Sequence, residues 1–238
     1  LVLWFWVPER RAPSRHLTFA AQLGGLAELL RDGAFRRLAI CLGTSQGATV
    51  AIQTLWVATW MRDVAGYSPA GVARGLLGVN VAMIVGYLGF GRAADRFTRA
   101  GRSPVPLLAG GVAVSSASFG LILLGLERLA PLLWFLFVAC GTAVVLSYSI
   151  LARRYPKEMS GRTNTAINTL GFAGMFTGQW LIGVVLDLWP KTATGYAPEA
   201  YPWAFGVAWL AQLGGLLWFL AGRRLLAPAS ASPSASPR

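Results

Sequence analysis

The chain has 238 residues, of which 55% are hydrophobic and only 13% are charged, and its mean hydropathy is +0.55. Average soluble domains carry about 25% charged residues, so this composition excludes an ordinary soluble fold. The net charge of +12 does not indicate a nucleic-acid partner, because the Lys and Arg residues lie in short loops between apolar segments instead of on one polar face.

The first 37 residues are predicted to precede the main bundle. Residues 1–8 are interpreted as the end of a truncated preceding transmembrane helix, since a signal peptide would carry its positive charge before its apolar run. Residues 9–37 are predicted to form a basic cytoplasmic loop. Within it, an apolar repeat at helical spacing indicates an amphipathic helix, either on the membrane surface or packed under the bundle. The repeat consists of Phe19, Leu23, Leu26 and Leu30.

Six apolar stretches follow, each close to the ~20 residues that a helix needs to cross the hydrocarbon of a bilayer. They cover residues 38–60, 72–91, 105–126, 129–151, 166–188 and 203–222. The connections between them are short and leave no room for a soluble domain. We therefore predict an all-α membrane protein, a six-transmembrane-helix bundle over residues 38–222, followed by a disordered cytoplasmic tail at residues 223–238.

Basic residues alternate between the two ends of the predicted bundle. Of the 21 Lys and Arg residues, only Arg62, Arg74, Arg128 and Lys191 fall at one end, and all others fall at the opposite end. Because cytoplasmic loops retain basic residues, this pattern predicts a multi-pass protein of a bacterial inner membrane with a cytoplasmic C-terminus. Aromatic residues near the poorly charged end are expected to lie at the lipid–water interface. They are Trp56, Trp60, Tyr67, Trp189, Tyr201 and Trp203.

A motif with the sequence GRAADRFTRAGR occupies residues 91–102, after the second predicted span. A carboxylate at the C-terminal end of a helix is opposed by the helix dipole by roughly 0.3–1 kcal/mol, so Asp95 needs neighbouring arginines or the N-terminus of another helix. The segment resembles the signature loop of the major facilitator superfamily. Gly91, Asp95, Arg96 and Arg99 match that loop, whereas Thr98 replaces the usual Gly and Ala100 replaces a basic residue.

The resemblance extends to the layout of the chain. A basic leader, six spans, the loop RRYPKEMSGRTN and the segment TNTAINTLGFAGMFTGQ are similar to helices 7 to 12 of that superfamily. This implies one half of a secondary transporter that moves a small-molecule substrate by alternating access, without a cofactor. The bilayer and a missing N-terminal six-helix half are the implied partners, and a cytoplasmic gate is implied for the motif. The gate residues are Gly91, Asp95, Arg96, Arg99 and Arg102; the alternative is an ordinary basic loop.

Uncharged polar residues are the candidates for substrate contact, because no acidic residue lies at mid-membrane depth in the predicted spans. A proton-coupling acid would therefore belong to the missing half. The family resemblance implies that the first, second, fourth and fifth spans line the central cavity. The candidates on these spans are Gln46, Thr49, Gln53, Asn80, Tyr148, Asn168 and Gln179. The alternative role for each is a hydrogen bond between helices.

Small residues are predicted to bring helices together. Gly43 and Gly47 stand four residues apart, as do Gly174 and Gly178, and Gly171 extends the second set. This spacing is typical of close helix packing in membranes, and in a transporter such contacts also serve rocking motions. Both cysteines, Cys41 and Cys140, are assigned to packing, and no metal site is predicted.

Other classes of membrane protein fit less well. An intramembrane enzyme would need a histidine or an acidic cluster inside the bundle, and the only histidine, His16, precedes it. A channel or a pump subunit is disfavoured because no filter-like loop joins the spans. A transport-inactive fragment, or a half-transporter subunit that needs a separate N-terminal half, stays open as an alternative.

Overall fold

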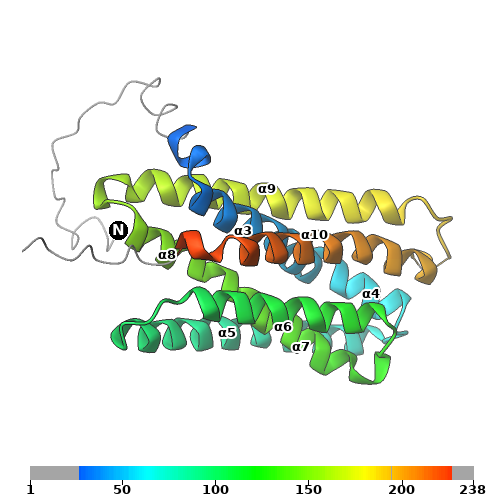
Figure 1. Ribbon diagram of the computed structural model, residues 1–238. Helices are drawn as coiled ribbons and strands as arrows, with labels where there is room; N and C mark the ends of the chain where they lie inside the picture. Colours follow the sequence, from blue (N-terminus) through cyan, green and yellow to red (C-terminus); the bar gives the residue numbers. More distant parts are fainter. Residues whose placement is uncertain (1–26, 194, 227–238) are drawn as a thin grey trace, which may run out of the picture.

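The computed structural model describes residues 27–193 and 195–226, and within these ranges every regular element is helical (Figure 1). Six helical segments are long and apolar enough to cross a membrane, which confirms the predicted six-helix bundle. The main helices are α3 (Gly33–Ala51), α4 (Val57–Asp63), α5 (Pro69–Arg99), α6 (Val105–Leu123), α7 (Ala130–Gly141), α8 (Leu146–Arg154), α9 (Ser160–Leu186) and α10 (Tyr201–Ala221).

Short irregular turns complete these segments. They are the π-helical turn η1 (Ile52–Trp56) and the 3₁₀ turns η2 (Glu127–Leu129), η3 (Thr142–Val145), η4 (Lys157–Met159), η5 (Pro198–Ala200) and η6 (Arg223–Leu226). The turn η1 joins α3 to α4 within the first span, and η3 joins α7 to α8 within the fourth. Two of the six spans are therefore interrupted in their interior.

Side-chain caps fix where two of the spans begin. Asp32 precedes α3 and its Oδ1 accepts a hydrogen bond from the Ala34 N–H at 2.7 Å. Ser68 precedes α5 in the same way, since its Oγ accepts from the Gly71 N–H at 3.2 Å, and Pro69 stands in the first turn. Such caps satisfy N–H groups that have no partner inside the helix.

The second span is longer than predicted, and this corrects the interpretation of residues 91–102 as a loop. The helix α5 continues through most of the motif and ends at Arg99. Residues 92–100 contain no Gly or Pro, so nothing in the chain interrupts the helix there. It stops at Gly101, which has a φ of 70°, and the Arg102 N–H donates to the Phe97 carbonyl at 2.8 Å. This is a Schellman-type helix end.

The helices pack in two groups (Figure 1). One group contains α3, α9 and α10, which contact one another, and the other contains α5, α6 and α7. The first span belongs to both, because α3 contacts α9 and α10 whereas α4 contacts α5. The bundle has two ends. Arg153 donates to Thr98 and Arg154 pairs with Asp32, so the arginine-rich connections meet at one end, here called the arginine-rich end.

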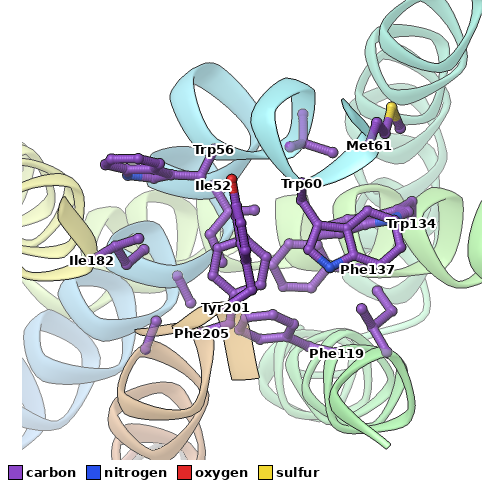
Figure 2. Packing of buried hydrophobic residues seen from close by; sticks show 14 of the residues in the cluster. Ile52, Trp56, Trp60, Met61, Phe119, Trp134, Phe137, Ile182, Tyr201 and Phe205 are labelled. Atoms are coloured by element: carbon purple, nitrogen blue, oxygen red, sulfur yellow. The ribbon is translucent and has the colours of Figure 1, made fainter. Parts of the chain in front are cut away.

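An aromatic core fills the opposite end of the bundle (Figure 2). Trp60 and Trp134 stand edge to face with ring centroids 5.3 Å apart, and Phe205 packs against Trp134 and Tyr201. The interfacial position of these aromatics stays a prediction, because burial inside the bundle does not fix their depth in a membrane. Trp56, Trp60 and Tyr201 are at most 6% exposed, and only Trp203 among the predicted aromatics is largely exposed, at 66%. Composition places aromatics near a membrane surface, but the helix rotation decides whether they face lipid.

Candidate functional site

Two irregular turns, η1 and η3, interrupt the first and the fourth spans. In η1 the Val57 N–H donates to the Ile52 carbonyl, five residues back, and the Thr54 hydroxyl donates to the Val50 carbonyl at 2.7 Å. In η3 the Thr142 hydroxyl donates to the Ala139 carbonyl at 2.7 Å. Hydroxyls that bond to their own helix backbone distort it, and π and 3₁₀ turns inside helices recur at functional sites.

A small polar cavity lies between the first span, from Ser45 to Gln53, and the turn η3 of the fourth span. Its volume is about 30 Å³, and its lining carries no charged side chain. The lining residues come from the first, second and fourth spans and are Ser45, Gln46, Thr49, Val50, Gln53, Met83, Tyr87, Gly141, Thr142, Val144 and Val145. A space of this size holds about one water molecule. The cavity is therefore too small to enclose a solute by itself.

Three of the predicted substrate contacts meet in this cavity: Gln46, Thr49 and Gln53. The Gln53 Nε2 lies 3.1 Å from the Met83 sulfur. The Thr49 hydroxyl is buried and has no hydrogen-bond partner among the described residues. Because a buried hydroxyl without a partner is costly, Thr49 offers an unused hydrogen-bonding group toward the cavity.

The other four candidates lie outside the cavity lining. The Tyr148 hydroxyl donates to Asn168 Oδ1 at 2.9 Å, which joins the fourth span to the fifth. Gln179 Nε2 donates to Thr54 Oγ1 at 3.0 Å, which joins the fifth span to the first. Asn80 is exposed on α5 and donates to the Leu76 carbonyl of its own helix at 2.8 Å. Of the seven candidates, three therefore share the cavity, two bond to each other, one bonds to Thr54 of the first span, and one bonds only to its own helix.

Polar residues that the sequence reasoning missed lie behind the cavity. Gln212 is fully buried and its Nε2 donates to Ser115 Oγ at 3.2 Å, while Ser115 Oγ donates to the Phe137 carbonyl at 2.8 Å. Ser45 and Thr142 also line the cavity and were not predicted. A signal was available, because each is a polar residue inside an apolar stretch. Hydroxyls are common in such stretches, so the signal alone selects too many residues.

The predicted packing glycines lie along the contact of α3 with α9. A Cβ atom on Gly47 would lie 2.8 Å from the Gly174 carbonyl oxygen, and one on Gly171 would lie 2.5 Å from Leu42. A Cβ on Gly174 would overlap the backbone of Gly43, and one on Gly178 would overlap the backbone of Gly47. The two helices therefore touch through their backbones along this line, here called the glycine seam.

The predicted gate residues all lie at the arginine-rich end and are exposed: Gly91, Asp95, Arg96, Arg99 and Arg102. Arg99 Nε donates to the Asp95 backbone carbonyl at 3.4 Å, but among the described residues no cation pairs with the Asp95 carboxylate. Thr98 accepts a hydrogen bond from Arg153, which fixes the motif to the end of α8. The Asp95 carboxylate is left available to a group outside the described residues.

Two carboxylates that were not predicted hold the ends of the first span. Asp63 is paired with Arg62, with Nε and Oδ1 2.6 Å apart, and its side chain is only 2% exposed. Its Oδ2 accepts from the Tyr201 hydroxyl at 2.8 Å and from the Tyr196 N–H at 3.1 Å. These bonds tie α4 to α10 and to the segment that precedes it.

Asp32 plays the corresponding part at the arginine-rich end. Besides capping α3, it accepts from Tyr155 and from Arg154 Nε at 3.2 Å, and Arg154 also donates to the Leu225 carbonyl at 3.1 Å. Burial raises the pKa of Asp32, but the hydrogen bonds from Tyr155, from the Ala34 N–H and from Arg154 outweigh burial and lower it. Asp32 is therefore held ionised.

Neither cysteine is paired in the structure; Cys41 is buried and Cys140 is half-buried. Among residues 27–193 and 195–226, no three His, Cys, Asp or Glu side chains gather as a metal site would require. Of the predicted amphipathic helix in the leader, the structure describes only the end: residues 27–31 are helical, with Leu29 buried and Leu30 41% exposed. Residues 1–8, His16, Phe19, Leu23 and Leu26 lie outside the described residues, as does most of the predicted tail.

Comparison with known proteins adds one finding. A family model described as Major Facilitator Superfamily matches residues 1–179, which covers the first four spans and most of the fifth. No curated protein and no solved structure matches the chain.

Proposed function

Since the chain belongs to the Major Facilitator Superfamily, we propose that it forms one six-helix half of a secondary transporter, equivalent to helices 7 to 12, and moves a small solute by alternating access. As a family member with six apolar helices, it is a multi-pass integral membrane protein and a membrane transporter in general. The observation that supports alternating access is the polar cavity between the first span and η3, close to the start of η1. Interrupted helices beside a polar space near the bilayer midplane are typical of transporter binding sites.

The cavity supplies half of a substrate site in this proposal. Gln46, Thr49 and Gln53 present two amides and a hydroxyl, which can donate to or accept from a polar solute. No charge is available in the cavity lining, so an ionic group on the substrate would be neutralised by the other half. The cavity holds only about one water molecule. The solute would therefore bind at the mouth of the cavity, where the cavity opens toward the second six-helix half.

The second half would cover the outer faces of α5 and α9. Only 17% of the residues in the most apolar window of each of these spans are buried, against 61% for the first and fourth spans. Exposed polar groups lie among the exposed apolar side chains, including Asn80 on α5 and Asn168 on α9. Uncovered amides at mid-membrane depth are unfavourable in lipid. A partner bundle, in the same polypeptide or a separate one, would shield them.

The motif on α5 would close the arginine-rich end, which we assign to the cytoplasm of a bacterial inner membrane. Asp95 would meet the N-terminus of a helix of the other half, where a carboxylate is stabilised by the helix dipole. Arg96, Arg99 and Arg102 would keep the surrounding surface cationic, and Gly91 would allow close approach of a neighbouring helix. The Asp95 carboxylate supports this role, because it is exposed and pairs with no cation within residues 27–193 and 195–226.

Cysteine accessibility tests the proposal without knowledge of the substrate. Gln53→Cys, made after Cys41 and Cys140 are replaced by alanine, would be probed with a membrane-impermeant maleimide in right-side-out and in inverted vesicles. Alternating access predicts labelling from both sides. Ala48→Cys, at a fully buried position of α3, is the negative control, and Trp203→Cys, at an exposed position, should react from one side only.

The two other readings predict different results. In a static structural bundle or an inactive fragment, the cysteine of Gln53→Cys would not react from either side of the membrane, or it would react from one side only. Labelling from one side that never switches would therefore overturn alternating access. Family membership and the six-helix fold would remain.

A further inference from the structure

A second and larger cavity lies away from the polar site, on the outside of the bundle. It is a groove of about 350 Å³ between α3, α9 and α10. The glycine seam forms its floor, with Gly43 and Gly47 on one side and Gly174 and Gly178 on the other, and Ala208 and Ala211 of α10 form a wall. This volume lies within the range of ~300–1,000 Å³ that is usual for ligand sites.

The groove is apolar and opens toward the surroundings of the bundle. Ile40 and Val207, which both line it, are 43% and 38% exposed. The Thr44 hydroxyl in its lining already donates to the Ile40 carbonyl of its own helix at 2.8 Å. An apolar groove on the outer face of a membrane-spanning bundle is filled by hydrocarbon, since water there would leave its hydrogen bonds unmade.

Arginines stand at one end of this groove. Arg36 lies one helical turn before Ile40, so it is placed on the same face of α3, and it is exposed. Arg37 lies over the Trp218 ring, 3.8 Å from its centroid, and donates to the Trp218 carbonyl. Trp218 stands two turns beyond Ala211 on α10. Helical spacing therefore places two guanidinium groups and an indole ring just beyond the lining of the groove at this end.

Charge complementarity indicates what occupies the groove. Among the described residues no acidic side chain pairs with Arg36 or Arg37. Exposed Arg223 and Arg224 of η6 add further positive charge just beyond α10. A molecule with a hydrocarbon chain and an anionic head at the level of the membrane surface matches both the groove and its end. Basic residues between transmembrane helices bind anionic lipid head groups in this way.

We propose that the groove between α3, α9 and α10 binds an anionic phospholipid, with one acyl chain on the glycine seam and the phosphate held by Arg36 beside Arg37. A guanidinium forms two parallel hydrogen bonds with a phosphate, and Arg37 retains donors beyond the one that Trp218 uses. The lipid would fill the space that the small residues leave open. This inference depends on the bundle lying in a bilayer and is independent of transport.

The test measures lipid retention by the purified protein. The protein in detergent is mixed with equal amounts of dioleoylphosphatidylglycerol and dioleoylphosphatidylcholine, and the bound lipids are counted by native mass spectrometry. We expect the wild type to retain the anionic lipid in preference, and Arg36→Gln to reduce that preference about fivefold. Arg92→Gln, a change of another exposed arginine on α5, is the matched control and should leave the preference unchanged.

Filling the groove tests the acyl-chain part of the site. Ala211→Phe places a ring in the groove at an exposed position of α10, so the bound lipid should be lost while the helix is retained. Ala173→Leu, at an exposed groove position of α9, serves if the first variant does not fold. Soluble glycerol 3-phosphate should not compete with the lipid, because it has no chain to occupy the groove.

Three results would overturn the proposal. The first is an unchanged preference in both Arg36→Gln and a folded groove-filling variant. The second is an equal loss in Arg92→Gln, which would mean that net charge alone attracts the lipid. The third is effective competition by glycerol 3-phosphate, which would remove the acyl chain from the site. Because vesicle labelling at Gln53→Cys is a separate measurement, failure here leaves the transport proposal standing.

Discussion

The first span presents two faces that are built in different ways. Toward α9, the helix α3 carries glycines that let the two backbones touch along the glycine seam. Toward α5 and α7, α3 and the adjoining turn η1 present two amides and a hydroxyl to a small cavity. Close backbone packing leaves no room for adjustment, whereas an irregular turn beside a cavity can change shape at low cost. One helix thus combines a rigid contact with an adjustable one.

The largest effect should come from breaking the rigid face. In Gly178→Ala the new Cβ would overlap the carbonyl of Gly47, and backbone atoms cannot rotate away as a side chain can. We expect the free energy of unfolding to fall by at least about 1–3 kcal/mol, and thermal unfolding in detergent measures this loss. Gly161→Ala in the same helix is the control, because its Cβ would meet nothing within 4 Å. Equal unfolding temperatures for the two variants would contradict a rigid seam.

The next largest effect should come from Asp63, at the end of the first span. This residue holds the span in position, and both of its faces depend on that position. Asp63→Ala removes the acceptor for the Tyr201 hydroxyl and the Tyr196 N–H inside a nearly buried site. Hydrogen bonds to a charged group contribute roughly 1.5–3 kcal/mol, so we expect a loss of that order. Asp187→Ala is the control, since its pairing with Lys191 is exposed. Exposed ion pairs contribute about 0–1 kcal/mol to the free energy of unfolding. If Asp187→Ala lost as much stability as Asp63→Ala, the bonds of Asp63 to Tyr201 and Tyr196 would have no special role in holding the first span.

A substitution on the cavity side of the bundle should change the free energy of unfolding only slightly. Thr142→Val keeps the size of the side chain but removes the hydroxyl that bonds to the Ala139 carbonyl in η3. Hydrogen bonds inside membrane bundles contribute ~0.6 kcal/mol on average, so thermal unfolding should shift only slightly. Thr142→Ser retains the hydroxyl and loses instead the methyl group at this 6%-exposed position, so it measures packing whereas Thr142→Val measures the hydrogen bond. A loss comparable to that of Gly178→Ala would show that the cavity face is as rigid as the seam.

The smallest effect is a pH dependence at the arginine-rich end of the same span. Asn caps a helix as well as Asp does, so Asp32→Asn removes mainly the charge. Because the folded-state pKa of Asp32 is lowered, its stabilisation is present above the ordinary value of 3.8 and disappears as the pH falls through the folded-state value. The wild type should exceed the variant by roughly 0.2–1 kcal/mol at neutral pH.

That difference should narrow in acid, in unfolding curves recorded for both proteins from neutral pH to below 3.8. Arg154→Gln provides the check on the partner, because it should reduce the effect of Asp32→Asn when the two changes are combined. A difference that stays constant down to the lowest pH would mean that the carboxylate charge contributes nothing to the fold.

The number and positions of the spans could be predicted because the length of an apolar run depends on local composition alone. The glycine spacing at Gly174 and Gly178 was also visible in the sequence, although its partner helix was not. Which of the aromatics are buried could not be predicted, because the burial of Trp60 or Tyr201 depends on how each helix is rotated in the bundle. The end of α5 was placed too early because hydropathy falls before the helix stops.

By itself the sequence determined a six-span membrane bundle, an uneven distribution of cations and a motif of the superfamily, since each follows from residues that are close together in the chain. Only the tertiary structure decided which polar residues share a cavity, where the helices are interrupted and which carboxylates are anchored. Asp32 meets Arg154 across 122 positions, and Asp63 meets Tyr201 across 138. Contacts of that kind depend on the packing of whole helices, which no local pattern records.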